Sequence, residues 1–143
     1  MIKKKNSKKG SKKSVAQIKA EAQAYFNLHI RERDKGRPCI SCGEYKKLQA
    51  GHYWGVHGYD ALRFDLDNAH GECERCNRFD GSHLIRYGAN LKKKIGSQRL
   101  KALNAKADQY DSGALKKITR AQAQEVLDLY KNLYLSKYKG RRG

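Results

Sequence analysis

Two pairs of cysteines are the residues of this sequence that are best suited to metal chemistry. The first pair is Cys39 and Cys42, and the second is Cys73 and Cys76. Four thiolates in two such pairs can close one tetrahedral zinc site, and the 30 residues between the pairs are enough for a hairpin. Because a four-cysteine site has no open coordination position, we expect this zinc to be structural.

Polar residues in the segment that the cysteines bound could carry a hydrolytic reaction. His52 and Asn68 lie between the two pairs, and Asn77 directly follows Cys76. A neutral imidazole can take a proton from water, and an amide oxygen suits a hard cation such as Mg²⁺. The residues therefore predict metal-dependent hydrolysis of a phosphodiester. Zinc ribbons also have two knuckles around a hairpin, so a non-catalytic nucleic-acid-binding protein is the alternative.

The charge of the chain indicates a polyanionic partner. The 143 residues carry 32 Lys and Arg against 14 Asp and Glu, a net charge of +18. Such an excess describes partners rather than fold, and we expect DNA, with an anionic membrane surface or an acidic protein as alternatives. The expected phosphate contacts surround the cysteines in sequence and are Arg63, Arg75, Arg78, Arg86, Lys92, Lys93 and Lys94. A solvated face is the alternative for the three lysines.

The N-terminal sequence and the cysteines indicate a reducing compartment. Lysines follow Met1 and Ile2 without an apolar run behind them, so we expect no secretory signal. No stretch approaches the roughly 20 apolar residues of a membrane span. We therefore expect a cytoplasmic protein without membrane attachment, whose cysteines bind metal instead of forming disulfides.

Helices and two strands must position these residues in an α+β fold. Ser14 is a candidate N-cap for a helix that runs to about Arg33 and ends before Gly36 and Pro38. Short, partly alternating segments predict strands over 48–55 and 62–66, with Leu62, Phe64 and Leu66 facing the core and Asn68 on or just after the second strand. A helix should begin near Asn77, with interruptions at Gly81 and Gly88.

Two further helices are expected in the C-terminal part. The first should end near Tyr110, before residues 111–113. The second should begin with a capping box, Thr119 to Gln122, and end near Lys137. Its tyrosines, spaced four apart, share one face that could stack on bases, although a core or partner-helix surface is commoner; they are Tyr130, Tyr134 and Tyr138. The expected organisation is a basic tail (1–13), a helix (14–35), a zinc-bound core (36–96), a helical region (97–137) and a second basic tail (138–143).

Several short motifs together resemble the NinG family of lambdoid phages, whose members are also called Rap. The motifs are Cys39–Gly43, Ala50–Tyr53, Leu62–Phe64, Asn68–His70 and Cys73–Asn77, followed by Gly81, Tyr87, Leu91 and Gly96. The resemblance covers residues 37–96 and extends more loosely over 97–137. It implies a structure-specific endonuclease acting on branched recombination DNA, such as Holliday junctions, in the bacterial host. It also implies a zinc-stapled ββα-metal core (HNH, treble-clef-like) with flanking helices.

The ending of the second knuckle is also similar to phage endonuclease VII. That similarity implies that Asn77 binds the catalytic Mg²⁺, which Mn²⁺ can replace, and that His52 is the general base. An acidic residue directly precedes the base in that enzyme, whereas Gly51 stands here. His70, Asp65 and Asp67 are therefore the candidates for a second metal ligand, and a phosphate contact or a knuckle cap is the alternative for His70. Asn68 should support the loop that carries His52.

The expected assembly follows from the expected substrate. Resolving a four-way junction takes paired nicks in two strands, and a twofold homodimer would supply two sites for them. An HNH nuclease that cuts ordinary duplex DNA is the alternative within the same enzyme class.

Overall fold

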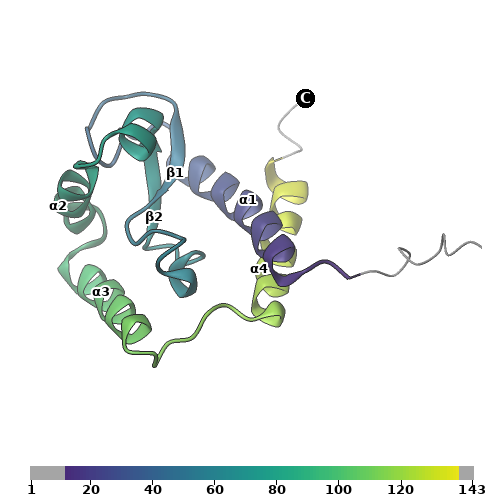
Figure 1. Ribbon diagram of the computed structural model, residues 1–143. Helices are drawn as coiled ribbons and strands as arrows, with labels where there is room; N and C mark the ends of the chain where they lie inside the picture. Colours follow the sequence, from purple (N-terminus) through teal and green to yellow (C-terminus); the bar gives the residue numbers. More distant parts are fainter. Residues whose placement is uncertain (1–11, 139–143) are drawn as a thin grey trace, which may run out of the picture.

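The computed structural model describes residues 12–138 and is a mixed α+β fold with one small sheet (Figure 1). Its main elements, in order, are α1 (Val15–Arg33), β1 (Leu48–His52), β2 (Ala69–Cys73), α2 (His83–Ile95), α3 (Ser97–Asp111) and α4 (Arg120–Leu133). Shorter pieces are a 3-10 turn, η2 (Asp60–Leu62), and two π-helical turns, η3 (Arg75–Phe79) and η4 (Tyr134–Tyr138). Nearly all of the two basic tails expected over 1–13 and 138–143 lies outside the described residues.

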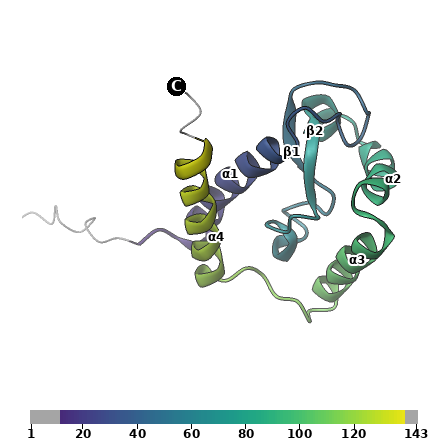
Figure 2. The same cartoon turned by 180° about the vertical axis from the view of Figure 1, so that it is seen from behind.

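The β1–β2 hairpin lies between two pairs of helices. Figures 1 and 2 show α1 beside α4 on one side of the hairpin and α2 with α3 on the other. The strands pair antiparallel with Leu48 opposite Cys73 and His52 opposite Ala69. Successive side chains of a strand point to opposite faces, so one face of the hairpin meets α1 and the other meets α2. This division decides which polar residues can act together.

Both flanking helices begin with the capping signals that their sequences predict. Ser14 Oγ accepts from the backbone N–H of Gln17, whose side chain accepts from the Ser14 N–H. Thr119 and Gln122 make the same reciprocal pair at the start of α4. Each box satisfies two N–H groups that a helix start leaves without partners, which explains why these two boundaries can be predicted from sequence.

The tyrosines of the last helix mostly form part of the core. Tyr130 is buried, and its ring meets Phe26 edge to face at a centroid distance of 5.4 Å. Tyr134 lies beside Tyr25 at 5.7 Å. The core interpretation is therefore confirmed for these two residues, and the side chain of Tyr138 lies outside the described part. Since α1 covers this stripe, the stripe gives no support to a dimer.

The second strand is not where the sequence pattern indicates. The segment 62–66 forms no ladder, and the chain instead makes a 3-10 turn over Asp60–Leu62 before β2 begins at Ala69. Buried Asp60 fixes this turn because its carboxylate accepts from Lys19, Arg63 and the backbone of Ile118. Leu62 and Phe64 face apolar neighbours as expected, but Leu66 is 44% exposed. The strand predicted over 62–66 is wrong.

The helix after the second knuckle is broken into pieces. A π-helical turn spans Arg75–Phe79, and α2 begins only at His83. Tyr87 and Leu91 of α2 are fully buried against Leu62 and Leu103. Gly96 then separates α2 from α3 with a φ of +88°, a conformation that favours glycine. The interruption expected at Gly81 is confirmed, whereas Gly88 lies inside α2 without breaking it.

Among the described residues, no helix combines the length and the apolar character that a membrane crossing requires.

Candidate active site at the cysteine-anchored hairpin

The four cysteines come together and can hold a metal ion such as zinc. All four Sγ atoms lie within 4.8 Å of one another, and those of Cys42 and Cys73 are 3.9 Å apart. A tetrahedron with Zn–S bonds of about 2.3 Å has S···S edges of about 3.8 Å, so the cluster has the size of a zinc site. The thiols are unpaired, as expected for metal ligands in two pairs.

The first knuckle folds so that its backbone supports the sulfur of Cys39. The N–H groups of Ser41, Cys42 and Cys73 donate to this sulfur at 3.3 to 3.4 Å. Gly43 closes the turn with a φ of +76° and donates its N–H to the Cys39 carbonyl. The donors favour a charged sulfur, which is the form that binds zinc.

His52 lies on the hairpin face that meets α1. Its ring is 6.2 Å from that of Phe26, and Nε2 donates to the Arg63 carbonyl at 3.0 Å. Gln23 of α1 is 3.4 Å from the same nitrogen. Burial is the main cause that lowers the pKa of His52, so the imidazole is neutral near pH 7. In this tautomer Nδ1, not Nε2, could accept a proton.

Asn77 contacts the other face of the hairpin. Its Nδ2 donates to Gln49 Oε1 at 2.8 Å, and Gln49 is opposite Glu72 in the ladder. Gln49 and His52 are three residues apart in β1, so their side chains point to opposite faces. The structure therefore does not bring His52 and Asn77 together as the sequence reasoning expected.

Asn68 supports the loop between the strands. Its Oδ1 accepts from the backbone N–H of Trp54, while its Nδ2 donates to the carbonyls of Trp54 and Leu62. The residue is fully buried and lies just before β2, instead of on or after the second strand. These bonds engage both ends of the amide, so its contacts are those of a residue that positions the loop.

His70 and the two aspartates expected near the metal are occupied elsewhere. Arg33 donates to His70 Nδ1 at 3.0 Å, and His70 Nε2 donates to the Asp67 carbonyl at 2.8 Å. Burial, with the charges of Lys94 and Arg33, lowers the pKa of His70 to about 4. Asp65 pairs with Lys106, and Asp67 pairs with Arg99. None of these contacts involves Asn77.

Glu72 occupies the space that a side chain on Gly51 would need. A Cβ atom at Gly51 would lie 2.2 Å from Glu72 Oε1 and 2.8 Å from Glu72 Cβ, which is too close for any real contact. The acidic residue that Gly51 replaces has thus a substitute on the neighbouring strand, on the Asn77 side of the hairpin. The sequence reasoning missed Glu72.

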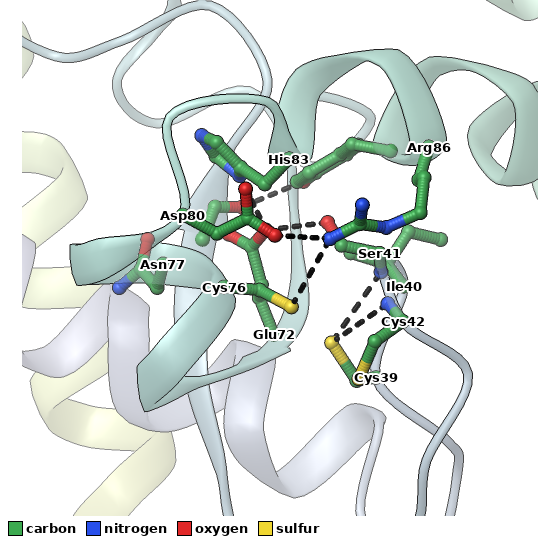
Figure 3. A network of polar contacts seen from close by, with 12 residues as sticks. Cys39, Ile40, Ser41, Cys42, Glu72, Cys76, Asn77, Asp80, His83 and Arg86 are labelled. Atoms are coloured by element: carbon green, nitrogen blue, oxygen red, sulfur yellow. Dashed lines mark hydrogen bonds and ion pairs between the residues drawn. The ribbon is translucent and has the colours of Figure 1, made fainter.

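A buried polar cluster surrounds that carboxylate (Figure 3). Glu72 Oε2 accepts from Ser41 Oγ and meets His83 Nδ1, both at 2.5 Å. Glu72 Oε1 is buried and has no hydrogen-bond partner among residues 12–138. The cluster joins the first knuckle, β2 and the first turn of α2. The available sequence signal was weak, because Glu72 is 11 residues from His83 and resembles an ordinary strand charge.

The basic residues expected at DNA differ in their availability. Arg75, Lys92 and Lys93 are exposed, as is Arg78, which pairs weakly with Glu74 at 3.4 Å. Arg86 is half-exposed beside Asp80 and Cys76. By contrast, the remaining two are held in internal ion pairs, Arg63 with Asp60 and Lys94 with Asp34. Those two side chains therefore stabilise the fold.

A second basic region was not expected from the sequence. It is a pocket between the end of α1 and the end of α2, lined by Arg33, Asp34, Arg37, His70, Lys94, Ile95 and Arg99. Asp34 neutralises part of this charge, since Arg33 and Lys94 both donate to it. These donors hold the pKa of the Asp34 carboxyl far below its usual value despite the opposing effect of burial.

Comparison with known proteins relates the chain to phage proteins. The family model described as Bacteriophage Lambda NinG protein matches residues 2–137. Protein NinG of Salmonella phage P22 is 34% identical over 113 residues, which are 76% of this chain and 56% of that protein. Protein NinG of Escherichia phage 933W is 41% identical over 80 residues, or 54% of this chain and 40% of that protein. The phage lambda protein is 40% identical over 80 residues, covering 54% and 39%.

The chain spans about half the length of the curated relatives it matches, between 39% and 56% in these three cases. No solved structure matches it. The family model covers almost the whole chain, from the first basic tail to the end of the last helix. The chain therefore belongs to the NinG family of bacteriophage proteins.

Proposed function

We propose that this protein is a metal-dependent DNA endonuclease that nicks branched recombination intermediates such as Holliday junctions. The observation that carries the proposal is the cysteine-anchored hairpin, which joins directly to a helical segment and presents Asn77 beside Gln49 and Glu72. The proposed core is of the zinc-stapled ββα-metal type. The resemblance of its motifs to phage junction nucleases supports this assignment.

Each metal has a separate role in this proposal. Cys39, Cys42, Cys73 and Cys76 hold a structural zinc, because a closed four-thiolate site cannot bind substrate. Asn77 contributes to a site for Mg²⁺ or Mn²⁺, since Nδ2 faces Gln49 and the amide oxygen is left for a cation. The cation would neutralise charge that develops on the phosphate and on the leaving oxygen. The residues of the chain hold the strand and move the protons.

The exposed basic residues on the Asn77 side support a DNA substrate. Arg75, Arg78, Lys92 and Lys93 can each contact phosphates without reading sequence. Their contribution should appear as salt-dependent binding, since each phosphate contact releases counterions. The charge of +18 over the whole chain agrees with such a partner.

Exposed apolar side chains near the same helix support a branched substrate. Phe79 is 73% exposed and Ile85 is 79% exposed, and Leu84 between them in space along the chain is 43% exposed. Apolar side chains of this kind can pack against bases that are partly unstacked, as they are at a branch point. Continuous duplex DNA offers fewer such bases.

The setting and assembly follow from the same proposal. A NinG-family protein would act in the reducing cytoplasm of a bacterial host, where thiolates stay available for zinc. Paired nicks across a junction favour a homodimer with twofold symmetry. The surface that would form this dimer is separate from the tyrosine stripe that α1 covers.

Cleavage of defined DNA substrates tests the proposal. Zinc-loaded protein should nick a four-way junction in the presence of Mg²⁺ or Mn²⁺, and removal of these ions with a chelator that spares the zinc should stop the reaction. A flap and a linear duplex of matched sequence should be cut more slowly. Equal rates on junction and duplex would exclude a preference for branched DNA. Binding without cleavage under all conditions would leave a non-catalytic DNA-binding protein.

A further inference from the structure

We propose that His83 and Glu72 form a carboxylate–imidazole pair in which His83 Nε2 takes the proton from the attacking water. This inference rests on the proposed nuclease function for the identity of the reaction, and it assigns the general base to a residue other than His52. It is based on the contacts of the pair, its place in the fold and the contrast with His52.

The contacts of the pair define which nitrogen of His83 carries the proton. His83 Nδ1 lies 2.5 Å from Glu72 Oε2, and a carboxylate only accepts, so Nδ1 is the donor. Nε2 is then the nitrogen that can accept a proton, and it has no hydrogen-bond partner among residues 12–138. Figure 3 shows this nitrogen pointing away from Glu72. A carboxylate behind an imidazole is the usual way to fix both the tautomer and the ring orientation.

Burial makes Glu72 a rigid support for the imidazole. The Glu72 side chain is fully buried, and Ser41 Oγ donates to the same oxygen that His83 meets. The ring of Tyr87 lies beside that of His83 with 6.4 Å between centroids. Because Gly51 closes the space on the other side of the carboxylate, Glu72 has little freedom to turn. The pair is therefore held in one geometry before a substrate arrives.

The energetic cost of the arrangement argues against a purely structural role. Glu72 Oε1 is buried without a partner, which costs stability, and an apolar side chain would avoid the cost in so small a core. Costly polar groups of this kind are typical of functional sites. The pair also lies next to the metal anchor, where the backbone is held most firmly.

The position of His83 allows a phosphate to reach it. The side chain of His83 is 17% exposed, whereas that of Glu72 is fully buried, so a reactant meets the imidazole first. His83 is the first residue of α2, and the free N–H groups of a helix start favour an anion. Arg86, one turn further along α2, is half-exposed and can reach the same phosphate.

The proposed step balances in atoms and charge. A water molecule gives one proton to His83 Nε2 while its oxygen forms a bond to phosphorus. The bond between phosphorus and the 3′ oxygen breaks, and that oxygen takes a proton from solvent to become a 3′ hydroxyl. The imidazolium, which Glu72 stabilises, then releases its proton to solvent. The products are a 5′ phosphate and a 3′ hydroxyl.

His52 is less suited to this step in the observed arrangement. Its Nε2 is occupied by the Arg63 carbonyl, and its ring lies against Phe26 on the α1 side of the hairpin. Asn77 and Glu72 lie on the opposite side. A base on the α1 side would be separated from the proposed metal ligand by the hairpin itself.

Single-turnover cleavage of a four-way junction by variants of the zinc-loaded protein tests the inference. His83→Ala should lower the rate at least about 100-fold, the usual contribution of a general base, while junction affinity is kept. Added imidazole should restore part of that rate, which a structural role for His83 would not allow. His57→Ala, at an exposed histidine, is the matched control and should keep the wild-type rate.

A second comparison tests Glu72 as a positioning residue. Glu72→Gln should lower kcat by about 10-fold or more without raising KM, because it removes the orienting charge and not a substrate contact. Glu74→Gln, at an exposed position two residues on, should leave both constants unchanged. Zinc content and circular dichroism identify any variant that fails to fold, and imidazole rescue of His83→Ala then decides the question.

Three outcomes would overturn the inference, and they separate it from the nuclease function. If His83→Ala cuts as fast as the wild type, His83 is not the base although the nuclease function stands. If a higher Mn²⁺ concentration rescues the variant and imidazole does not, His83 is a metal ligand instead. If the wild type cuts no DNA at all, the nuclease function itself is refuted and the step has no reaction to serve.

Discussion

Replacing His70 by glutamine should remove much of the acid sensitivity of this fold. His70 is 1% exposed, and its pKa is lowered to about 4 from an ordinary value of 6.5. Burial is the largest cause, and the charges of Lys94 and Arg33 add to it, while the Asp67 carbonyl and Asp34 oppose it. Below pH 6.5 the unfolded chain binds a proton that the folded chain does not bind until about pH 4. Stability must therefore fall as the pH falls through this window.

The size of the effect follows from the two pKa values. The contribution of neutral His70 is fully present above about pH 6.5. At pH 5 the loss amounts to about 2 kcal/mol, and below pH 4 it levels off at about 3 kcal/mol. The side chain is buried, so solvent screening does not reduce these figures much. Glutamine carries no charge at either pH and should lose neither amount.

Urea unfolding of the zinc-loaded protein at pH 7 and pH 5 measures the difference. The free energy of unfolding of the wild type should drop by about 2 kcal/mol more than that of His70→Gln. Protonation of the cysteine thiolates affects both proteins and cancels in this comparison. His57→Gln is the control for loss of an exposed imidazole. An equal drop in the wild type and His70→Gln would refute the buried neutral state of His70.

Other substitutions test the metal site, a helix start and the basic surface. Cys73→Ser should lose zinc and most of the fold, which zinc analysis and circular dichroism would show; full retention of both would contradict a four-cysteine site. Thr119→Ala should cost about 1 kcal/mol in urea unfolding, and no loss would show that the capping box of α4 is idle. Lys93→Ala should lower the salt slope of DNA binding by about one without affecting stability. Lys94→Ala should instead destabilise the fold by about 2 kcal/mol, since buried Asp34 loses a donor; the reverse pattern would contradict the internal ion pair.

The parts of the fold that were predictable from sequence are those that depend on neighbouring residues. The capping boxes at Ser14 and Thr119 act over three residues, so their sequences alone indicate where α1 and α4 begin. The two cysteine pairs likewise bring their own constraint, because one metal requires all four sulfurs in one place. Such signals are independent of how the rest of the chain packs.

The second strand and the composition of the site depend on distant contacts. Residues 62–66 alternate like a strand, but Asp60 is held by Lys19 and Ile118, both far away in sequence. The pairing of β1 with β2 then places His52 and Asn77 on opposite faces of the hairpin. The pair of Glu72 and His83 is just as remote from local sequence signals, since it forms only once α2 packs on β2.

The nicking rate of a four-way junction by wild-type protein and by Asn77→Ala tests the proposed nuclease site most directly. Both zinc-loaded proteins would be mixed in excess with a labelled junction, with Mg²⁺ and without it. The wild type should nick the junction only with Mg²⁺, and the variant should bind the junction normally but nick it at least about 100-fold more slowly, because it lacks the oxygen that we assign to the cation. An unchanged rate for Asn77→Ala, or nicking that needs no divalent cation, would contradict a metal-dependent site at Asn77.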